Sequence, residues 1–319
     1  MKEFIAIGNI TNDLPDNPSG EPRVGGGVTY AAIAARRLGM ESKIITKAPA
    51  NHPYLGQISL LGVDITRLET FSEDKVDHIT TFRNTYDDDG NRTQHVSEAQ
   101  EMIGKNDLPN FPMVGKDPIF FVSPVLDDVD PNIFVNLAQK GNLVITPQGY
   151  FRKVQGNGEV TRTPWKQIDL LSHAELVVLS DEDITFNAGL DKEYLERIIT
   201  ACRIVVLTRG KNGLIVYKDG DKTLDIDAFP ISNQEIISPT GAGDSCAAAF
   251  TWHYYKNRDL LTAGVFASMY PAFKLIGVGG NKRGVEALPT IEQVKTYMGK
   301  DQVRVNSYLK ANNIVDLKI

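Results

Sequence analysis

The residues best suited to chemistry lie together in one segment, residues 237–250. Its centre reads Gly241-Ala242-Gly243, and Asp244 follows directly. Small residues at the start of a helix leave backbone N–H groups open, and the helix dipole there favours an anion. Fixed N–H donors also stabilise the negative charge that a phosphoryl group carries during its transfer. The segment therefore indicates a site for a phosphoryl group.

The carboxylate of Asp244 begins the helix that we expect over residues 241–256. There it can accept the proton of a hydroxyl group that attacks the γ-phosphate of a nucleotide. The same aspartate can also be present only because the helix dipole favours a negative charge. The alanines at 247–249 favour a nucleotide site, since small residues allow close backbone approach, but they also fit tight packing of the helix against a sheet.

Alternating strand and helix patterns surround this segment and must position it. A strand at 4–10, a helix at 28–39 and a strand at 42–48 form the start that is typical of a mostly parallel sheet. We therefore expect a single α/β domain over residues 1–319. Further strands are expected at 118–122, 143–146, 176–179 and 204–208, and further helices at 130–139, 165–172, 192–201, 259–275, 290–298 and 300–312.

Two hairpins interrupt the alternation of strands and helices. Residues 76–96 contain β-branched alternation on both sides of an Asp-rich turn at 87–91, which predicts a hairpin inserted in the chain. Such a hairpin is a lid, a dimer surface or a purely structural element. A second, antiparallel hairpin is expected over residues 213–229, at an edge of the sheet.

Composition argues against several classes of protein. The net charge is −6, and no Lys/Arg cluster is longer than a pair, which disfavours a nucleic-acid partner. No apolar run reaches the ~18 residues of a membrane span, so no membrane partner and a cytoplasmic location are expected. Two distant cysteines, Cys202 and Cys246, and five scattered histidines disfavour disulfides and a zinc site.

Two other nucleotide-binding motifs are disfavoured as well. A P-loop needs Gly-x-x-x-x-Gly-Lys-Ser/Thr, and this string is missing from the sequence. A Rossmann fingerprint needs Gly-x-Gly-x-x-Gly directly after the first strand, but the glycines at 25–27 come later and lack that spacing.

Residues 239–245, followed by the small-residue helix, resemble the C-terminal signature of the ribokinase/PfkB family of carbohydrate and nucleoside kinases. The resemblance implies a three-layer ribokinase-like fold: a mostly parallel central sheet, helices on both faces and a small β lid formed by about residues 10–24 and 76–96. It also implies that Asp244 is the general base and that the backbone of residues 241–243 is the anion hole.

Further segments extend the resemblance towards the N-terminus. Asp13 follows the first strand, where the family uses an aspartate to hold substrate hydroxyls, and a carboxylate suits a polyol because it accepts two hydroxyl hydrogen bonds. A turn or cap role for Asp13 is the alternative. Gly25, Gly26 and Gly27 resemble the family's N-terminal glycine signature near the substrate. Tyr30 stands where the family usually has an asparagine, which leaves the type of substrate open.

On the ATP side, residues 208–213 resemble the family's turn over the nucleotide phosphates. The resemblance assigns ATP binding to Thr208, Gly210 and Gly213, and also to Thr240 in the C-terminal signature. An ordinary turn rich in glycine and asparagine explains residues 208–213 equally well.

Two segments depart from the family pattern. The usual Asn-x-x-Glu, which orders Mg²⁺ waters, is replaced by residues 180–183, in which Asp183 can take the place of the glutamate through water. Residues 146–152 read Thr-Pro-Gln-Gly-Tyr-Phe-Arg, a string that resembles an inositol-kinase-like branch of the family.

These patterns predict an ATP- and Mg²⁺-dependent kinase that phosphorylates a hydroxyl group of a small polyol: a sugar, an inositol or a nucleoside. The alternative is a non-catalytic nucleotide- or sugar-sensing protein on the same fold, which the altered Ser180 and Tyr30 positions suggest. Lid hairpins often pair between subunits in the family, so both a homodimer and a monomer stay open.

Overall fold

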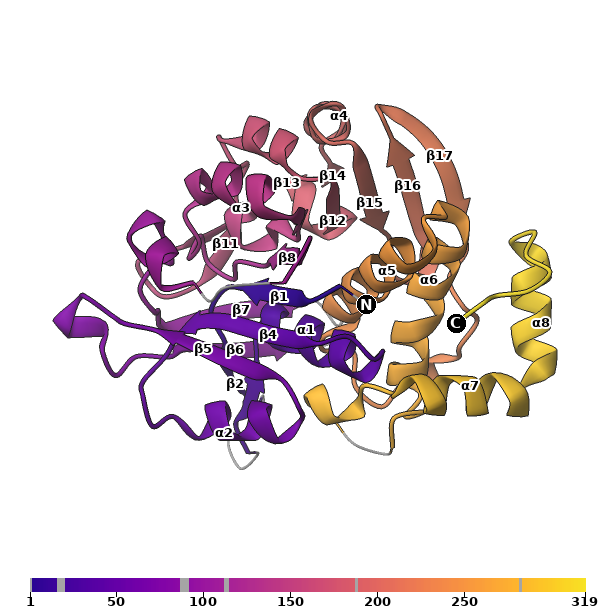
Figure 1. Cartoon of the computed structure of the whole chain (residues 1–319), viewed down its shortest axis with the longest axis horizontal. Helices are drawn as coiled ribbons and strands as arrows, with labels where there is room; N and C mark the ends of the chain where they lie inside the picture. The colour runs from indigo at the N-terminus through magenta and orange to yellow at the C-terminus, as the bar shows by residue number, and fades with distance from the viewer. Residues whose placement is uncertain (1, 16–20, 87–91, 112–114, 187–188, 281–282) are drawn as a thin grey trace.

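A mostly parallel β-sheet forms the centre of the molecule (Figure 1). The computed structural model describes residues 2–319 except 16–20, 87–91, 112–114, 187–188 and 281–282. The strands of this sheet are β1 (Phe4–Ile7), β4 (Ser42–Lys47), β5 (Asp64–Leu68), β8 (Ile119–Val122), β9 (Asn142–Ile145), β12 (Leu176–Ser180), β15 (Ile204–Thr208), β16 (Leu214–Lys218) and β17 (Asp221–Ile226). Within the described residues their order is β17-β16-β15-β12-β9-β8-β1-β4-β5, and β16 is the strand that runs antiparallel to both neighbours.

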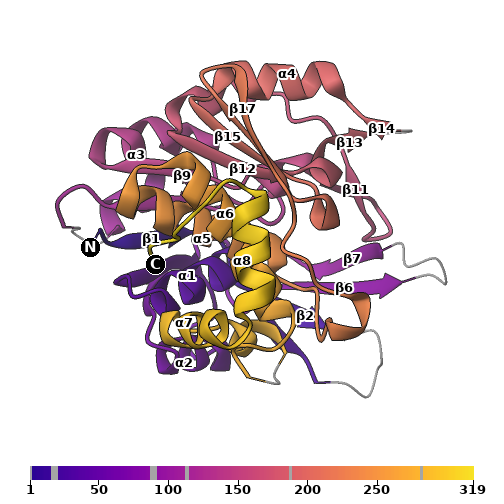
Figure 2. The same cartoon turned by 90° about the vertical axis from the view of Figure 1, so that its right-hand side faces the viewer.

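Helices cover both faces of the sheet. One face carries α1 (Gly27–Arg37), α5 (Ala242–Asn257) and α6 (Leu260–Leu275), with α7 (Ile291–Lys300) and α8 (Gln302–Ala311) outside them (Figure 2). The other face carries α3 (Phe134–Lys140), α4 (Lys192–Ala201) and a 3₁₀ helix, Ile168–His173. Successive side chains of a strand point to opposite faces, so Phe4 and Ala6 of β1 enter one core, and Ile5 and Ile7 enter the other.

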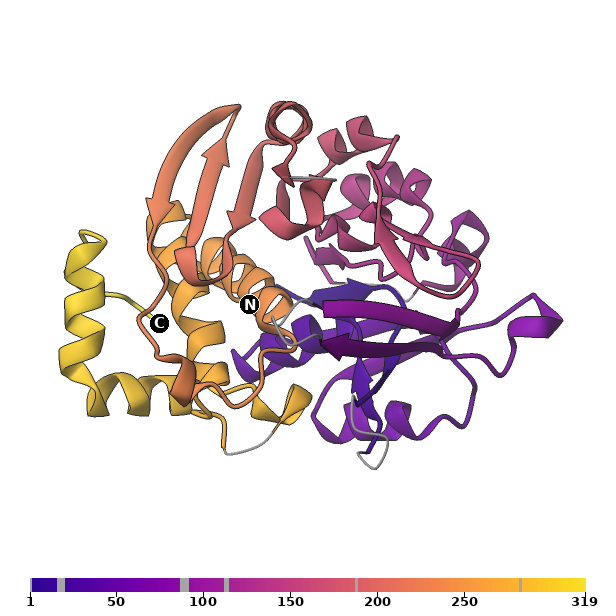
Figure 3. The same ribbon diagram turned by 180° about the vertical axis from the view of Figure 1, so that it is seen from behind.

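A second, smaller sheet stands at the carboxyl ends of β1 and β4, and Figure 3 shows it from behind. It contains β2 (Thr11–Leu14), β3 (Arg23–Gly25), β6 (Thr80–Tyr86) and β7 (Arg92–Glu98) in the order β3-β2-β6-β7. We call it the lid sheet. Gln100 ties its base to the central sheet, because its side chain accepts from the N–H of Thr80 at 2.9 Å and donates to the backbone carbonyl of Lys47.

The expected three-layer α/β architecture is confirmed, and most of the expected strands and helices are present. Residues 165–172 form a 3₁₀ rather than an α-helix, and 130–139 divide into a 3₁₀ turn and α3. The turn at 87–91 lies outside the described residues. The sequence patterns did not reveal α2 (Pro53–Leu60), β5, the pair β10 (Arg152–Val154) and β11 (Val160–Arg162), or the pair β13 (Thr185–Phe186) and β14 (Gly189–Leu190).

The described helices include none with the length and apolar composition that a membrane crossing requires. Cys202 and Cys246 are both buried free thiols.

Candidate active site

The loop that leads into α5 has a backbone shape that requires glycine. Gly241 is the N-cap of α5 and has a φ of 77°, in the left-handed region. A Cβ on Gly241 would lie 2.1 Å from Cδ1 of Tyr30, so no larger residue fits. Gly243, the second residue of the helix, has no described atom within 4 Å of the place a Cβ would take. The start of this helix is therefore backed by a buried ring at Gly241 and has open space at Gly243.

Asp244 lies where the starts of two helices meet. A Cβ on Gly27, the first residue of α1, would lie 2.8 Å from Oδ1 of Asp244 and 2.1 Å from Oγ of Ser123. Ser123 directly follows β8, at the carboxyl edge of the central sheet. The glycine thus lets three segments that are far apart in the sequence converge on one carboxylate.

Charges around Asp244 tune its acidity. Burial raises the pKa of Asp244 to about 6, Arg152 and Lys274 oppose this rise, and Asp183 and Asp13 add to it. A carboxylate with this pKa is mostly ionised at neutral pH but is more basic than an exposed aspartate. These properties suit a general base that works near neutral pH.

Asp13 faces the same region from the lid sheet. It lies on β2, and a Cβ on Gly25 of β3 would lie 2.2 Å from its Oδ2. The hydroxyl of Thr11 donates to Oδ1 of Asp13 at 2.9 Å. The charge of Asp13 also helps to raise the pKa of Tyr54, whose hydroxyl donates to Oδ1 of Asn12 at 2.7 Å. The structure therefore brings Asp13, the glycines and Asp244 into one neighbourhood.

Tyr30 and Gly26 support this neighbourhood from behind. Tyr30 is 3% exposed, and its ring packs against Gly241, so it fits a role as a support of the loop better than one as a surface for a substrate. Gly26 is the N-cap of α1 with a φ of 91°, and a Cβ there would lie 2.9 Å from the carbonyl oxygen of Asn9. The close approach of these backbones explains why Gly26 has no side chain.

The four residues expected to bind ATP have different surroundings in the structure. Thr208 ends β15 beside Ser180 of β12, and Gly210, with a φ of 52°, has no described atom within 4 Å of a Cβ. At position 213, chain packing requires a glycine, since a Cβ there would lie 2.0 Å from the carbonyl oxygen of Ile226 on β17. The carbonyl of Thr240 accepts a hydrogen bond from Lys274.

Asp183 is held rigidly beside this region, in the 3₁₀ helix Asp181–Ile184. Its Oδ1 accepts from Nε2 of Gln148 at 3.0 Å, and its Oδ2 accepts from the N–H of Ser180 at 3.0 Å. The described residues contain no group of three or more His, Cys, Asp or Glu that could hold a metal ion. Mg²⁺ bound to nucleotides is held mainly by phosphates and water, so one fixed carboxylate that still has lone pairs fits a contact through water.

Three residues near Asp244 were not assigned a role from sequence. Ser123 follows a buried strand, and Arg152 lies in a string whose role was left undefined. Lys274 is a lone lysine between apolar residues of α6, which is the one signal that could have drawn attention to it. Their places depend on contacts between distant segments, which patterns along the chain do not report.

Comparisons with known proteins find similarity to kinases. Residues 157–280 match the model of the pfkB family carbohydrate kinases. A cytidine kinase of Thermococcus kodakarensis is 27% identical over 82% of this chain and 91% of its own length. A nucleoside kinase of Methanocaldococcus jannaschii is 22% identical over 90% of this chain and 89% of its own length.

Solved structures show the same fold. A pyrophosphate-dependent kinase of the ribokinase family, solved as a sulfate complex, has a TM-score of 0.72 at 23% identity and covers 85% of this chain and 95% of its own. The fold is thus that of the ribokinase family. Residues 157–280 thus match the pfkB family carbohydrate kinases, and the relatives of the chain are kinases, which transfer a phosphoryl group to a hydroxyl acceptor. The resemblance of residues 239–245 to that family is confirmed.

Proposed function

We propose that this protein transfers the γ-phosphoryl group of ATP to a hydroxyl group of a small polyol, with Asp244 as the general base. The observation that carries the proposal is the place of Asp244: it lies in the first turn of α5, against Gly27, with a pKa raised to about 6. A helix-start aspartate with only a capping role would not need this raised pKa or this convergence of α1, β8 and α5.

The acceptor binds between the lid sheet and the start of α5 in this proposal. Asp13 accepts hydrogen bonds from hydroxyl groups that do not react, and Gly25 leaves room for the carboxylate of Asp13. The reacting hydroxyl gives its proton to Asp244 as its oxygen attacks phosphorus. The N–H groups of residues 241–243 stabilise the charge on the transferred phosphoryl group.

ATP lies beside Thr208, Gly210 and Thr240 in the proposed complex. Mg²⁺, when bound, neutralises charge on the phosphates. Asp183 orients water on that side, and Gln148 and Ser180 keep its carboxylate in place. Closure of the lid sheet over the acceptor excludes water and so favours transfer over hydrolysis of ATP.

A nucleoside is the first acceptor to test, because two relatives that cover most of this chain are a cytidine kinase and a nucleoside kinase. Inositol is the second, because a kinase with the same fold was solved with a pyrophosphate analogue and myo-inositol. The matching assay measures phosphorylated product from nucleosides, inositols and sugars with ATP, and repeats the panel with pyrophosphate as donor.

The change Asp244→Asn tests the role of the base. Loss of a general base lowers turnover by about 10²–10⁴-fold, while ATP binding should persist because the backbone donors remain. Glu193→Gln is the matched control, since Glu193 is an exposed carboxylate in the first turn of α4. Near-normal turnover in Asp244→Asn would refute the proposal. ATP binding by the wild-type protein without any phosphorylated product across the panel would favour a non-catalytic sensor.

A further inference from the structure

The ammonium group of Lys274 is a buried charge that the proposed chemistry does not use. Lys274 lies in the last turn of α6 and is 1% exposed. Lysine is almost never fully buried unless its charge is paired, because removal of an ammonium from water costs much free energy. Its surroundings must therefore provide specific stabilisation.

The acceptors of this ammonium are two backbone carbonyls of the loop that leads into α5. Nζ donates to the carbonyl oxygen of Ser238 at 2.8 Å and also to that of Thr240. The N–H of Ile237 donates to the carbonyl of Leu275 at 2.9 Å, so the end of α6 holds this loop at three points. The negative end of the α6 dipole also favours a cation in its last turn.

Peptide geometry links this contact to the anion hole. The peptide group between Thr240 and Gly241 is planar and trans, so its C=O and N–H point in opposite directions. Since Lys274 draws the Thr240 carbonyl towards α6, the N–H of Gly241 must point away from α6. The ring of Tyr30, whose centroid lies 5.9 Å from Nζ, packs under Gly241 and limits its movement.

We propose that Lys274 is a positioning residue for phosphoryl transfer, whose ammonium group holds the Ser238 and Thr240 carbonyls so that the N–H of Gly241 faces the transferred group. The inference rests on the kinase function proposed above. It adds a second effect, because Lys274 opposes the rise of the Asp244 pKa and so helps to keep the base ionised. Both effects act on the transition state more than on binding of the acceptor at Asp13.

The change Lys274→Met removes the charge and retains most of the side-chain volume. We expect kcat to fall by about 10–100-fold, the scale of losing one donor to the developing charge, with the acceptor KM within threefold. Lys310→Met is the matched control, since Lys310 is an exposed lysine in the last turn of α8, and it should leave kcat unchanged. A folded Lys274→Met protein with kcat within twofold of wild type would overturn the inference.

Chemical rescue separates positioning from packing. Lys274→Ala opens a space lined by the two carbonyls, which ammonium or methylammonium can fill while donating N–H groups to them. We expect these ions to restore kcat at least fivefold, whereas tetramethylammonium at equal ionic strength has no N–H and should not. Equal effects of both kinds of ion would contradict the proposal.

The wild-type enzyme provides a test that needs no variant to fold. Burial lowers the pKa of Lys274 to about 8, against the opposing effect of Asp244; Asp244 from α5 and Tyr30 from α1 are the titratable groups that face it. We expect kcat to fall as the pH rises through about 8, and a profile flat to about pH 9.5 would overturn the inference. A wild-type protein that phosphorylates no acceptor would instead refute the proposed function, so the two failures differ.

Discussion

Among the single residues, Asp244 has the most consequential surroundings. Burial works against its charge, while Arg152 and Lys274 favour it. The balance leaves the pKa of Asp244 near neutral pH, where a general base is most effective. Two measurable consequences follow, one for activity and one for stability.

The pH dependence of turnover should report the ionisation of Asp244. The base works only when deprotonated, so kcat/KM should rise tenfold per pH unit below about 6 and level off above it, until the fall near pH 8 that is expected from Lys274. Since Arg152 lowers the pKa of Asp244, Arg152→Met should move the midpoint to higher pH. A steady-state pH profile of both proteins provides the measurement, and an unchanged midpoint would mean that the profile reports another group.

The ionised carboxylate should cost stability. Its pKa in the folded chain is raised from 3.8 to about 6, so the folded state holds the proton more tightly than the unfolded state. The cost is fully present above about pH 6 and disappears as the pH falls towards 4. Asp244→Asn should therefore raise Tm by about 1–2 °C at pH 7, with a smaller gain at pH 4.5. Calorimetry at both pH values measures this, and a lower Tm at pH 7 would contradict it.

At the scale of an element, the start of α5 has two glycines, and the structure gives a different explanation for each. Gly241 is required by its φ of 77° and by the ring of Tyr30 beneath it. Gly243 has neither constraint, because no described atom lies within 4 Å of a Cβ there. Only a group that approaches from outside would use the space above Gly243.

Alanine substitution should distinguish the structural requirement at Gly241 from the need for open space at Gly243. Gly243→Ala should leave Tm unchanged or slightly higher, because alanine favours a helix, but should lower kcat by about tenfold or more as its methyl group crowds the phosphoryl group. Gly241→Ala should lower both Tm and kcat. Thermal unfolding and steady-state kinetics of both variants measure these changes. An unchanged kcat in Gly243→Ala would place the phosphoryl group elsewhere.

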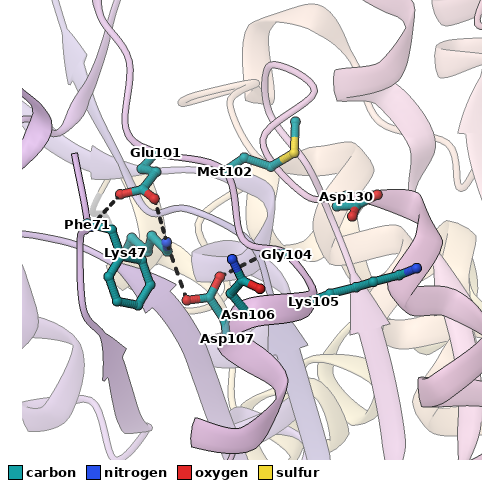
Figure 4. Close-up of a pocket in the computed structure, with 9 residues that line it drawn as sticks. All are labelled: Lys47, Phe71, Glu101, Met102, Gly104, Lys105, Asn106, Asp107 and Asp130. Carbon is teal, nitrogen blue, oxygen red and sulfur yellow. Dashed lines mark hydrogen bonds and ion pairs between the residues drawn. The ribbon is translucent and has the colours of Figure 1, made fainter.

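At the scale of the whole molecule, a buried ion cluster joins the lid sheet to the central sheet (Figure 4). Nζ of Lys47, at the end of β4, lies 3.2 Å from Glu101 and 3.3 Å from Asp107, beside a hollow of about 320 Å³. Burial opposes the charge of Glu101, but N–H groups of Ser72 and Phe71, together with Lys47, hold the pKa of Glu101 below its ordinary value. These contacts fix the segment that follows β7.

Loss of the central cation should destabilise the whole fold. Lys47 is 1% exposed and Asp107 is 2% exposed, so Lys47→Met leaves a buried carboxylate without its partner, at a cost of about 3–5 kcal/mol. Tm should fall by about 5–10 °C. The control is Lys43→Met, on the same strand as Lys47. It removes a more exposed ion pair between Lys43 and Glu3 and should cost less than about 1 kcal/mol. Equal Tm values for the two variants would show that the cluster does not stabilise the fold.

The sequence by itself determined what depends on neighbours along the chain. The segment at 239–245 is contiguous, so its glycines and Asp244 predict a phosphoryl site without knowledge of the rest of the chain. The amphipathic helix α4 follows from hydrophobic spacing alone. Short elements such as α2 were missed because few residues carry their signal. Residues 168–173 form a 3₁₀ helix that buries Ile168 and Leu171, which lie one three-residue turn apart.

The tertiary structure alone decided how distant segments meet. Gly27, Ser123 and Asp244 lie far apart in the sequence, and only the parallel sheet, which gathers the carboxyl ends of its strands at one edge, brings them into contact. The same contacts bury Lys274 against two loop carbonyls and pack the ring of Tyr30 against Gly241. Local patterns report which residues can do chemistry, whereas burial and charge, which set their pKa values, arise only after the chain has packed.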